Sequence, residues 1–189
     1  ETDVTSPRLC RATLDSLPDG VAGLGYNPSE ITAGIVHLGP GAFHRAHMAR
    51  YVHALMNNGQ AMDWGIIGAG LTPFDAGVRD ALSAQDWLYT LVERDDDGAM
   101  AQVVGSIVDI VAPEDTEDIL DFIDGAGVRI VSLTVSENGY CLDAITRRLD
   151  RANPLIGMDL AHPRRPGSVI GLLVEACRRR RSAEIGRAH

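Results

Sequence analysis

The fold is decided by the stretch Ile35-Val36-His37-Leu38-Gly39-Pro40-Gly41-Ala42-Phe43-His44-Arg45-Ala46-His47. It begins as a short apolar run, breaks at two glycines one residue apart, and continues with helical spacing of its apolar residues. A strand, a glycine turn and a helix start together present unpaired backbone N–H groups and the positive end of a helix dipole. Glycine also lets a ligand come close to the backbone. The stretch therefore predicts the phosphate-binding turn of a dinucleotide-binding domain.

Apolar runs and helical patterns alternate on either side of this turn. Strands are expected at 34–38, 64–68, 88–92, 101–104, 107–111 and 128–134, with a hairpin signal at Asp97-Gly98. Helices are expected near 9–14, over 43–57, from Pro73 with Thr72 as its cap, from Pro113, and after Ser168. Residues 141–167 are expected to be irregular because they hold three prolines. The pattern predicts an α/β fold with a Rossmann-like, mostly parallel sheet, flanking helices and an added β-hairpin.

The domain organisation follows from the same pattern. Residues 1–33 are expected to form an N-terminal arm, and residues 34–183 one NAD-binding domain of Rossmann type. Residues 184–189 resemble a translated sequencing adapter, so we expect a non-native tail and a chain cut off inside a larger protein. Ligands bind at the carboxyl ends of parallel strands, where the turns 39–43, 68–75 and 134–140 would line one crevice.

Composition excludes several classes of function. The chain has 17 basic and 26 acidic residues and a formal net charge of -9, which argues against a general nucleic-acid binder. The basic run 178–181 is better explained as a solvated helix end than as a nucleic-acid tail. Three scattered cysteines indicate reduced thiols. Since no apolar run approaches the ~18 residues of a transmembrane helix and no signal peptide is visible, a cytoplasmic protein without a membrane partner is expected.

The candidate site residues, taken singly, give weak signals. The usual dinucleotide fingerprint has a third glycine where this chain has His44, so an ordinary strand-to-helix turn is an equally good interpretation. Asp75 could accept hydrogen bonds from the adenosine ribose, or could be a surface acid at a helix start. His44 and His47 are spaced to reach one metal ion, but no third ligand is apparent, so no metal is expected. Arg45 and His47 either anchor the helix start or contact cofactor or substrate.

Several segments, in order, resemble the polyol-specific long-chain dehydrogenases, the mannitol 2-dehydrogenase and fructuronate reductase family. The string Gly39–His47 is similar to the G-x-G-x-F-H-R-A-H signature of that family. Further matching segments are Asp63-Trp64-Gly65-Ile66, Gly68-Ala69-Gly70-Leu71, Leu88-Tyr89-Thr90-Leu91, Gly105-Ser106-Ile107, Ile130-Val131-Ser132-Leu133-Thr134, Glu137-Asn138-Gly139-Tyr140 and Asn153-Pro154-Leu155. The resemblance covers roughly residues 30 to 182.

The resemblance implies roles for individual residues. The NAD pyrophosphate would lie on the loop Gly39, Pro40, Gly41, Ala42 and Phe43, with Thr134 and Gly139 also on the cofactor side. Asp75 would bind the adenosine ribose and favour NAD over NADP, although the second acid that some members carry is here Phe74. Glu137 would relay a proton between the active site and solvent; a surface glutamate capping a turn is the alternative. His44, Arg45 and His47 would be substrate-side or structural.

The resemblance also implies that the catalytic lysine lies in a helical C-terminal domain, within a K-x-x-x-x-N-x-x-H pattern. This chain has no lysine, and arginine cannot replace it because arginine does not deprotonate in proteins. The expected function is therefore that of the NAD-binding domain of a polyol dehydrogenase acting on a mannitol-like substrate. A hexuronate (fructuronate or tagaturonate) reductase and a non-catalytic nucleotide-binding module are the alternatives. An open reading frame beyond codon 183 that encodes the lysine pattern would favour an enzyme, and a stop codon there the module.

Overall fold

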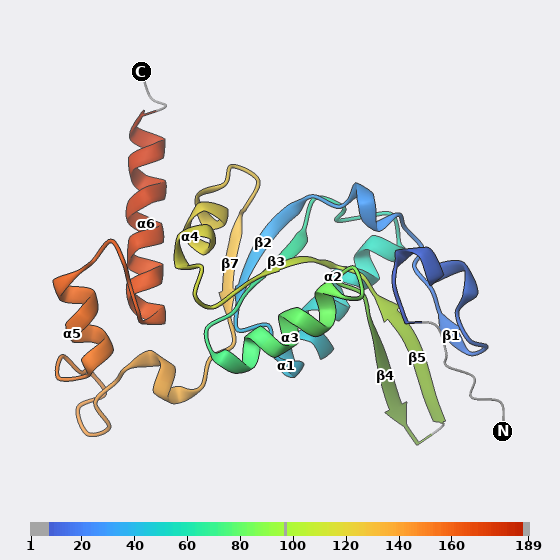
Figure 1. The fold of residues 1–189 in the computed structure, drawn as a ribbon, viewed down its shortest axis with the longest axis horizontal. Helices are drawn as coiled ribbons and strands as arrows, with labels where there is room; N and C mark the ends of the chain where they lie inside the picture. The colour runs from blue at the N-terminus through green and yellow to red at the C-terminus, as the bar shows by residue number, and fades with distance from the viewer. Residues whose placement is uncertain (1–7, 97, 187–189) are drawn as a thin grey trace.

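The computed structural model describes residues 8–96 and 98–186, with the backbone alone for residues 182–186. The elements in chain order are η1 (Arg11–Ser16), β1 (Val21–Ala22), η2 (Pro28–Glu30), β2 (Ala33–Leu38), α1 (Ala42–Ala46), α2 (Met48–Asn57), β3 (Gly65–Ala69), α3 (Pro73–Ser83), β4 (Tyr89–Asp95), β5 (Gly98–Val104), β6 (Ile107–Val111), α4 (Thr116–Asp124), β7 (Ile130–Leu133), η3 (Glu137–Tyr140), α5 (Pro154–Ala161) and α6 (Val169–Gly186). Figure 1 shows a central sheet between two helical layers, with α4 and α6 on one side and α2 and α3 on the other.

The central sheet is parallel and has the strand order β6-β3-β2-β7. Its register places Leu38 beside Ala69 on one side and beside Leu133 on the other. The chain therefore runs outward from β2 to β3 and β6, and then returns to place β7 on the opposite side of β2. The predicted α/β fold with a Rossmann-like, mostly parallel sheet is confirmed.

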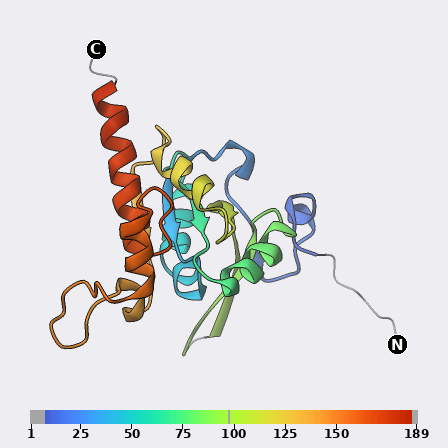
Figure 2. The same cartoon turned by 60° about the vertical axis from the view of Figure 1, so that its left-hand side comes forward.

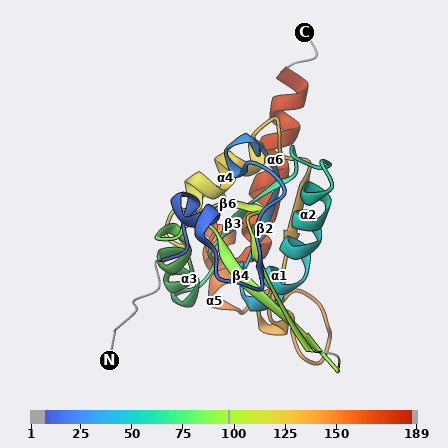
Figure 3. The same cartoon turned by 90° about the vertical axis from the view of Figure 1, so that its right-hand side faces the viewer.

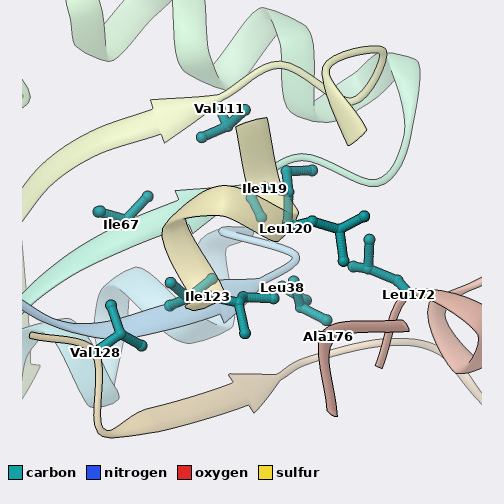
Figure 4. Packing of buried hydrophobic residues seen from close by; sticks show 11 residues of the cluster. Leu38, Ile67, Val111, Ile119, Leu120, Ile123, Val128, Leu172 and Ala176 are labelled. Atoms are coloured by element: carbon teal, nitrogen blue, oxygen red, sulfur yellow. The ribbon is translucent and has the colours of Figure 1, made fainter. Parts of the chain in front are cut away.

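Alternation along β2 divides the core between the two faces of the sheet, because successive strand residues point in opposite directions. Val36 and Leu38 pack with residues of α4 and α6, as Figure 4 shows for Leu38, Leu120 and Leu172. Ile35 packs on the other face with residues of α2, α3 and the hairpin. Full burial of a leucine or isoleucine stabilises the fold by roughly 1.5–3 kcal/mol, so the two clusters fix the helices on their faces.

The expected hairpin is present as β4 and β5, which pair in antiparallel register. Asp97, at its turn, lies outside the described residues. β5 also pairs with β1 of the N-terminal arm, so the arm contributes a strand to a second, three-stranded sheet. Figures 2 and 3 show that the hairpin extends away from the central sheet. The short helix expected near residues 9–14 is the 3-10 helix η1.

Two expectations about helices were wrong. The single helix expected over 43–57 is interrupted at His47, whose φ of -117° and ψ of -85° are not helical. The segment 141–167, expected to be irregular, contains α5. Its start is a capped one, since the Asn153 side chain accepts a hydrogen bond from the Leu155 N–H and Pro154 follows the cap. Proline at a first helical position begins a helix rather than breaking one.

The last helix begins as predicted. The Ser168 hydroxyl oxygen accepts a hydrogen bond from the Gly171 N–H at 3.0 Å, which is the contact of a helix cap. The backbone of α6 is described through Gly186, and whether residues 184–189 are native stays a prediction. Across residues 8–96 and 98–186, no helix combines the length and the apolar character that a membrane span requires.

Candidate functional site

A crevice of about 520 Å³ opens at the carboxyl ends of the parallel strands. It lies where the strand order reverses, between the ends of β2 and β7, which is where doubly wound folds bind their ligands. Its volume falls in the range of about 300–1,000 Å³ typical of small-molecule sites. One side, which we name the sheet wall, consists of Gly39, Gly41, Gly70, Leu71, Thr72, Asp75 and Thr134. The opposite side, the outer wall, consists of Asn153, Leu155, Pro166, Gly167, Ser168, Val169 and Leu172.

The glycine turn brings the backbone of β2 against that of β7. Gly39 has a φ of +84°, and a β-carbon there would lie 2.6 Å from the carbonyl oxygen of Thr134. Its N–H donates to the carbonyl of Ala69 at 2.9 Å, and the Thr134 N–H donates to Leu38 at 3.0 Å. At Gly41 a β-carbon would meet nothing within 4 Å, so the surface beside it is open. The first glycine is therefore required by the protein backbone, and the second borders open space.

Asp75 lies in the sheet wall, where the sequence interpretation required it. Its side chain is buried, which excludes the simple surface acid of the alternative interpretation. Its Oδ2 accepts hydrogen bonds from the N–H of Leu71, the N–H of Thr72 and the Thr72 hydroxyl, at 3.0, 2.9 and 2.9 Å. Among the described residues no hydrogen bond reaches Oδ1. One carboxylate oxygen thus secures the start of α3.

The residues that follow the glycine turn hold it by hydrogen bonds. Arg45 donates from Nη1 to the Pro40 carbonyl at 2.7 Å, and Tyr89 donates its hydroxyl to the Arg45 carbonyl at 2.6 Å. His47 lies at the break between α1 and α2, with its Nδ1 2.8 Å from the Phe43 carbonyl. Of the F-H-R-A-H string and the Pro40 and Ala42 beside it, no residue lines the crevice, so the structure places them behind the turn or beside it.

His44 is buried and stacks on His37 of β2, with ring centroids 3.6 Å apart. Within the described part of the chain, neither ring nitrogen of His44 has a hydrogen-bond partner. Burial, together with the charges of His37 and Arg45, lowers its pKa from 6.5 to about 3. Burial likewise lowers the pKa of His37 to about 4, opposed in part by a hydrogen bond with the backbone of Gly39. Both imidazoles are therefore neutral near pH 7.

The segment after β7 carries the remaining predicted residues. Thr134 and Gly139 line the crevice, whereas Glu137 does not, although its neighbours Ser136 and Asn138 do. The Glu137 carboxylate is exposed and forms an ion pair with Arg147, Oε1 to Nη1, at 2.7 Å. Glu137 is thus at the edge of the crevice and in contact with solvent.

The Asp159 contacts that hold the outer wall were not anticipated from the sequence. It is held by Asp159 of α5, a buried carboxylate whose Oδ1 accepts from the N–H of Gly167 at 2.6 Å and of Ser168 at 3.3 Å. Its Oδ2 accepts from the Ser168 hydroxyl. Two sequence signals fall in this wall: the Ser168 cap of α6, which was predicted, and the cap Asn153-Pro154, which the prolines nearby obscured. Over residues 8–96 and 98–186, no group of three or more His, Cys, Asp or Glu side chains could hold a metal ion.

The family model described as the mannitol dehydrogenase Rossmann domain matches residues 33–187. The chain belongs to the mannitol dehydrogenase family. The match begins at the first residue of β2 and includes both walls of the crevice, so the resemblance expected from the F-H-R-A-H string is confirmed.

Members of the family share this fold closely. The mannitol 2-dehydrogenase of Cereibacter sphaeroides is 44% identical over 161 residues, covering 85% of this chain and 34% of that protein. A polyol:NADP oxidoreductase of Gluconobacter oxydans is 41% identical over 179 residues, covering 93% of this chain and 36% of that protein. The solved structure of Pseudomonas fluorescens mannitol 2-dehydrogenase, a ternary complex with NAD and D-mannitol, superposes with a TM-score of 0.89 at 41% identity. It covers 95% of this chain and 37% of that one. The chain thus spans about a third of the length of these relatives.

Proposed function

We propose that this chain is the NAD-binding part of an oxidoreductase that moves a hydride between the C2 hydroxyl of a mannitol-like polyol and NAD. The observation that carries the proposal is the crevice between the ends of β2 and β7, in which Gly39, Gly41, Asp75 and Thr134 meet. A relative of the same fold holds NAD and D-mannitol together. The relatives named above are polyol enzymes, which supports a polyol over a hexuronate substrate.

The residues present suit the cofactor. Gly41 leaves open space beside the turn, where the NAD pyrophosphate would lie against backbone N–H groups. The free Oδ1 of Asp75 would accept hydrogen bonds from the adenosine ribose. When bound, NAD supplies the nicotinamide that exchanges the hydride. We assign residues 34–183 to this cofactor-binding domain and residues 1–33 to an arm that adds a strand to the hairpin sheet.

Glu137 is proposed to carry the proton. Its carboxylate lies at the carboxyl end of β7, at the edge of the crevice and exposed to solvent, so it could pass a proton outward. The group that takes the proton from the substrate hydroxyl is not supplied here, because the sequence contains no lysine. We therefore expect no NADH formation from D-mannitol by the purified 189-residue chain. Measurable turnover would contradict this assignment of the chemistry to residues outside the chain.

Binding is tested by calorimetric titration of the chain with NAD and with NADP. We expect NAD to bind more tightly, because the ribose 2′-phosphate of NADP would lie beside the Asp75 carboxylate. Asp75→Asn should reduce the ratio of the dissociation constant for NADP to that for NAD by about tenfold, the effect of one charged hydrogen bond. The ratio is the informative quantity, since a weaker start of α3 would affect both cofactors alike. An unchanged ratio would show that Asp75 does not bind the ribose.

A further inference from the structure

His37 connects the two strands between which the crevice opens. It lies in β2 and is buried. Both nitrogens of its ring have hydrogen-bond partners in β7 or directly after it. Nδ1 is 2.8 Å from the hydroxyl of Ser132, and Nε2 is 2.7 Å from the hydroxyl of Thr134. Ser132 belongs to β7, whereas Thr134 follows it and lines the crevice. A single imidazole thus spans from the interior of the sheet to the site.

The ring of His37 has little freedom. His44 stacks on its face at a centroid distance of 3.6 Å and an interplanar angle of 17°. Ser132, which holds Nδ1, also lies 3.5 Å from the sulfur of Met48 at the start of α2. The imidazole is therefore held by its face and by one edge, and its other edge is directed at Thr134. A neutral imidazole offers one donor and one acceptor, so it can satisfy both hydroxyls without bringing charge into the core.

Thr134 needs such support because it has left the sheet. Its side chain is exposed, and its own backbone is held by the Leu38 carbonyl and packed on Gly39. An exposed threonine in water would sample more than one χ1 rotamer. The hydrogen bond to His37 selects the rotamer that places Oγ1 toward the sheet.

We propose that His37 is a positioning residue that sets the orientation of the Thr134 hydroxyl at the crevice, with His44 and Ser132 holding the imidazole. The consequence for cofactor affinity rests on the proposed binding of NAD. A preset rotamer lowers the entropy lost when a ligand contacts Thr134, so the network would strengthen NAD binding without touching NAD itself.

The test measures the rotamer and the affinity separately. In His37→Phe a flat ring still packs on His44, but both hydrogen bonds are lost. We expect three-bond NMR couplings to show one dominant χ1 rotamer of Thr134 in the unliganded wild-type chain and rotamer averaging in the variant. We expect the calorimetric dissociation constant for NAD to rise about threefold to tenfold, the cost of ordering one side chain on binding.

The matched control is His53→Phe. His53 is also buried with two ring contacts, to the Tyr26 hydroxyl at 2.8 Å and the Asn57 amide at 3.0 Å, but it lies outside the crevice. Its substitution should lower the melting temperature and leave both the rotamer of Thr134 and NAD affinity unchanged. Equal effects of the two phenylalanine variants would reduce His37 to a structural residue.

A double-mutant cycle with Thr134→Val completes the test. Because Thr134 is exposed, the valine variant should fold, and it should lose NAD affinity by at least the factor seen in His37→Phe, since it removes the hydroxyl itself. Combining the two should add no further loss, whereas additive losses would contradict the proposal. Should His37→Phe not fold, His37→Gln, which keeps a donor and an acceptor, takes its place with partial averaging expected. Failure of the wild-type chain to bind NAD would contradict the proposed function, while the rotamer measurement still decides the role of His37.

Discussion

The two walls of the crevice are held together by different means. In the sheet wall the glycine turn is held by contacts between backbone groups, the Gly39 N–H on the Ala69 carbonyl and the Thr134 N–H on the Leu38 carbonyl. In the outer wall a single buried side chain, Asp159, accepts from the backbone N–H groups of Gly167 and Ser168. At Gly39 the sheet wall therefore tolerates no added atom, whereas the outer wall depends on one carboxylate.

The largest expected effect is that of Gly39→Ala in the sheet wall. The positive φ and the 2.6 Å approach to the Thr134 carbonyl together should cost about 3 kcal/mol of unfolding free energy, measured by urea denaturation. Gly41→Ala is the control, because a β-carbon there has open space and a φ of -68°. It should keep its stability and lose NAD affinity. Equal stability losses in the two variants would show that the backbone does not require glycine at position 39 more than at position 41.

The next largest effect is that of Asp159→Ala in the outer wall. Two backbone N–H groups and a hydroxyl lose their acceptor, so we expect a loss of about 2 kcal/mol in unfolding free energy. Hydrogen exchange should increase at Gly167 and Ser168 and stay unchanged at Gly39. Asp150→Ala, which removes an acceptor for a single backbone N–H, should cost less. Faster exchange in both walls would show that they do not behave as separate units.

The next effect is that of mild acid, which should destabilise the fold through His37 and His44, buried behind the sheet wall. Burial lowers the folded-state pKa of His37 to about 4 and of His44 to about 3, below the 6.5 of the unfolded chain. Between these pKa values the unfolded state therefore binds more protons than the folded state. The stability that the neutral histidines provide above pH 6.5 is lost as the pH falls towards their folded-state pKa values. From about pH 7 to about pH 6 the two histidines should cost about 1 to 2 kcal/mol in urea unfolding.

Glu175 and the variant His44→Phe show which side chains cause this loss of stability in mild acid. On α6, hydrogen bonds from Arg178 lower the pKa of Glu175 to about 2, so this carboxylate stays charged and contributes nothing to the change between pH 7 and 6. His44→Phe removes two buried ring nitrogens that have no partner among the described residues. That variant should be more stable by about 1 kcal/mol at pH 7 and less sensitive to acid. An acid sensitivity equal to that of the wild-type chain would exclude His44 as a cause.

The smallest expected effect is that of Arg147→Gly, at the surface beside the edge of the crevice. Arg147 has a φ of +56°, which costs about 1–2 kcal/mol for a residue with a β-carbon, and glycine would relieve this strain. Its ion pair with Glu137 is exposed, and such pairs contribute about 0–1 kcal/mol. We therefore expect stability to rise by less than about 1 kcal/mol in thermal unfolding. A clear loss would show that the ion pair stabilises the edge of the crevice more than its exposure suggests.

The glycine turn of the sheet wall was predictable and the Asp159 contacts of the outer wall were not, for a physical reason. Strand and glycine-turn signals are local, so the run before Gly39 and the cap at Thr72 could be read from neighbouring residues. Asp159 and Ser168 are nine residues apart in an apparently irregular segment, and nothing local shows that one caps the other. The break at His47 was missed because the apolar spacing of a helix continues through it.

The sequence by itself determined the α/β class, the order of strands and helices, the glycine turn, and the membership of the mannitol dehydrogenase family, because each depends on patterns within a few residues. Only the tertiary structure decided which predicted residues face the crevice. It placed Gly39, Asp75 and Thr134 there and left His44 and Arg45 behind the turn. It also paired His37 with Thr134, 97 positions apart. Such pairings depend on which strands become neighbours in the sheet, and sequence spacing carries no record of that choice.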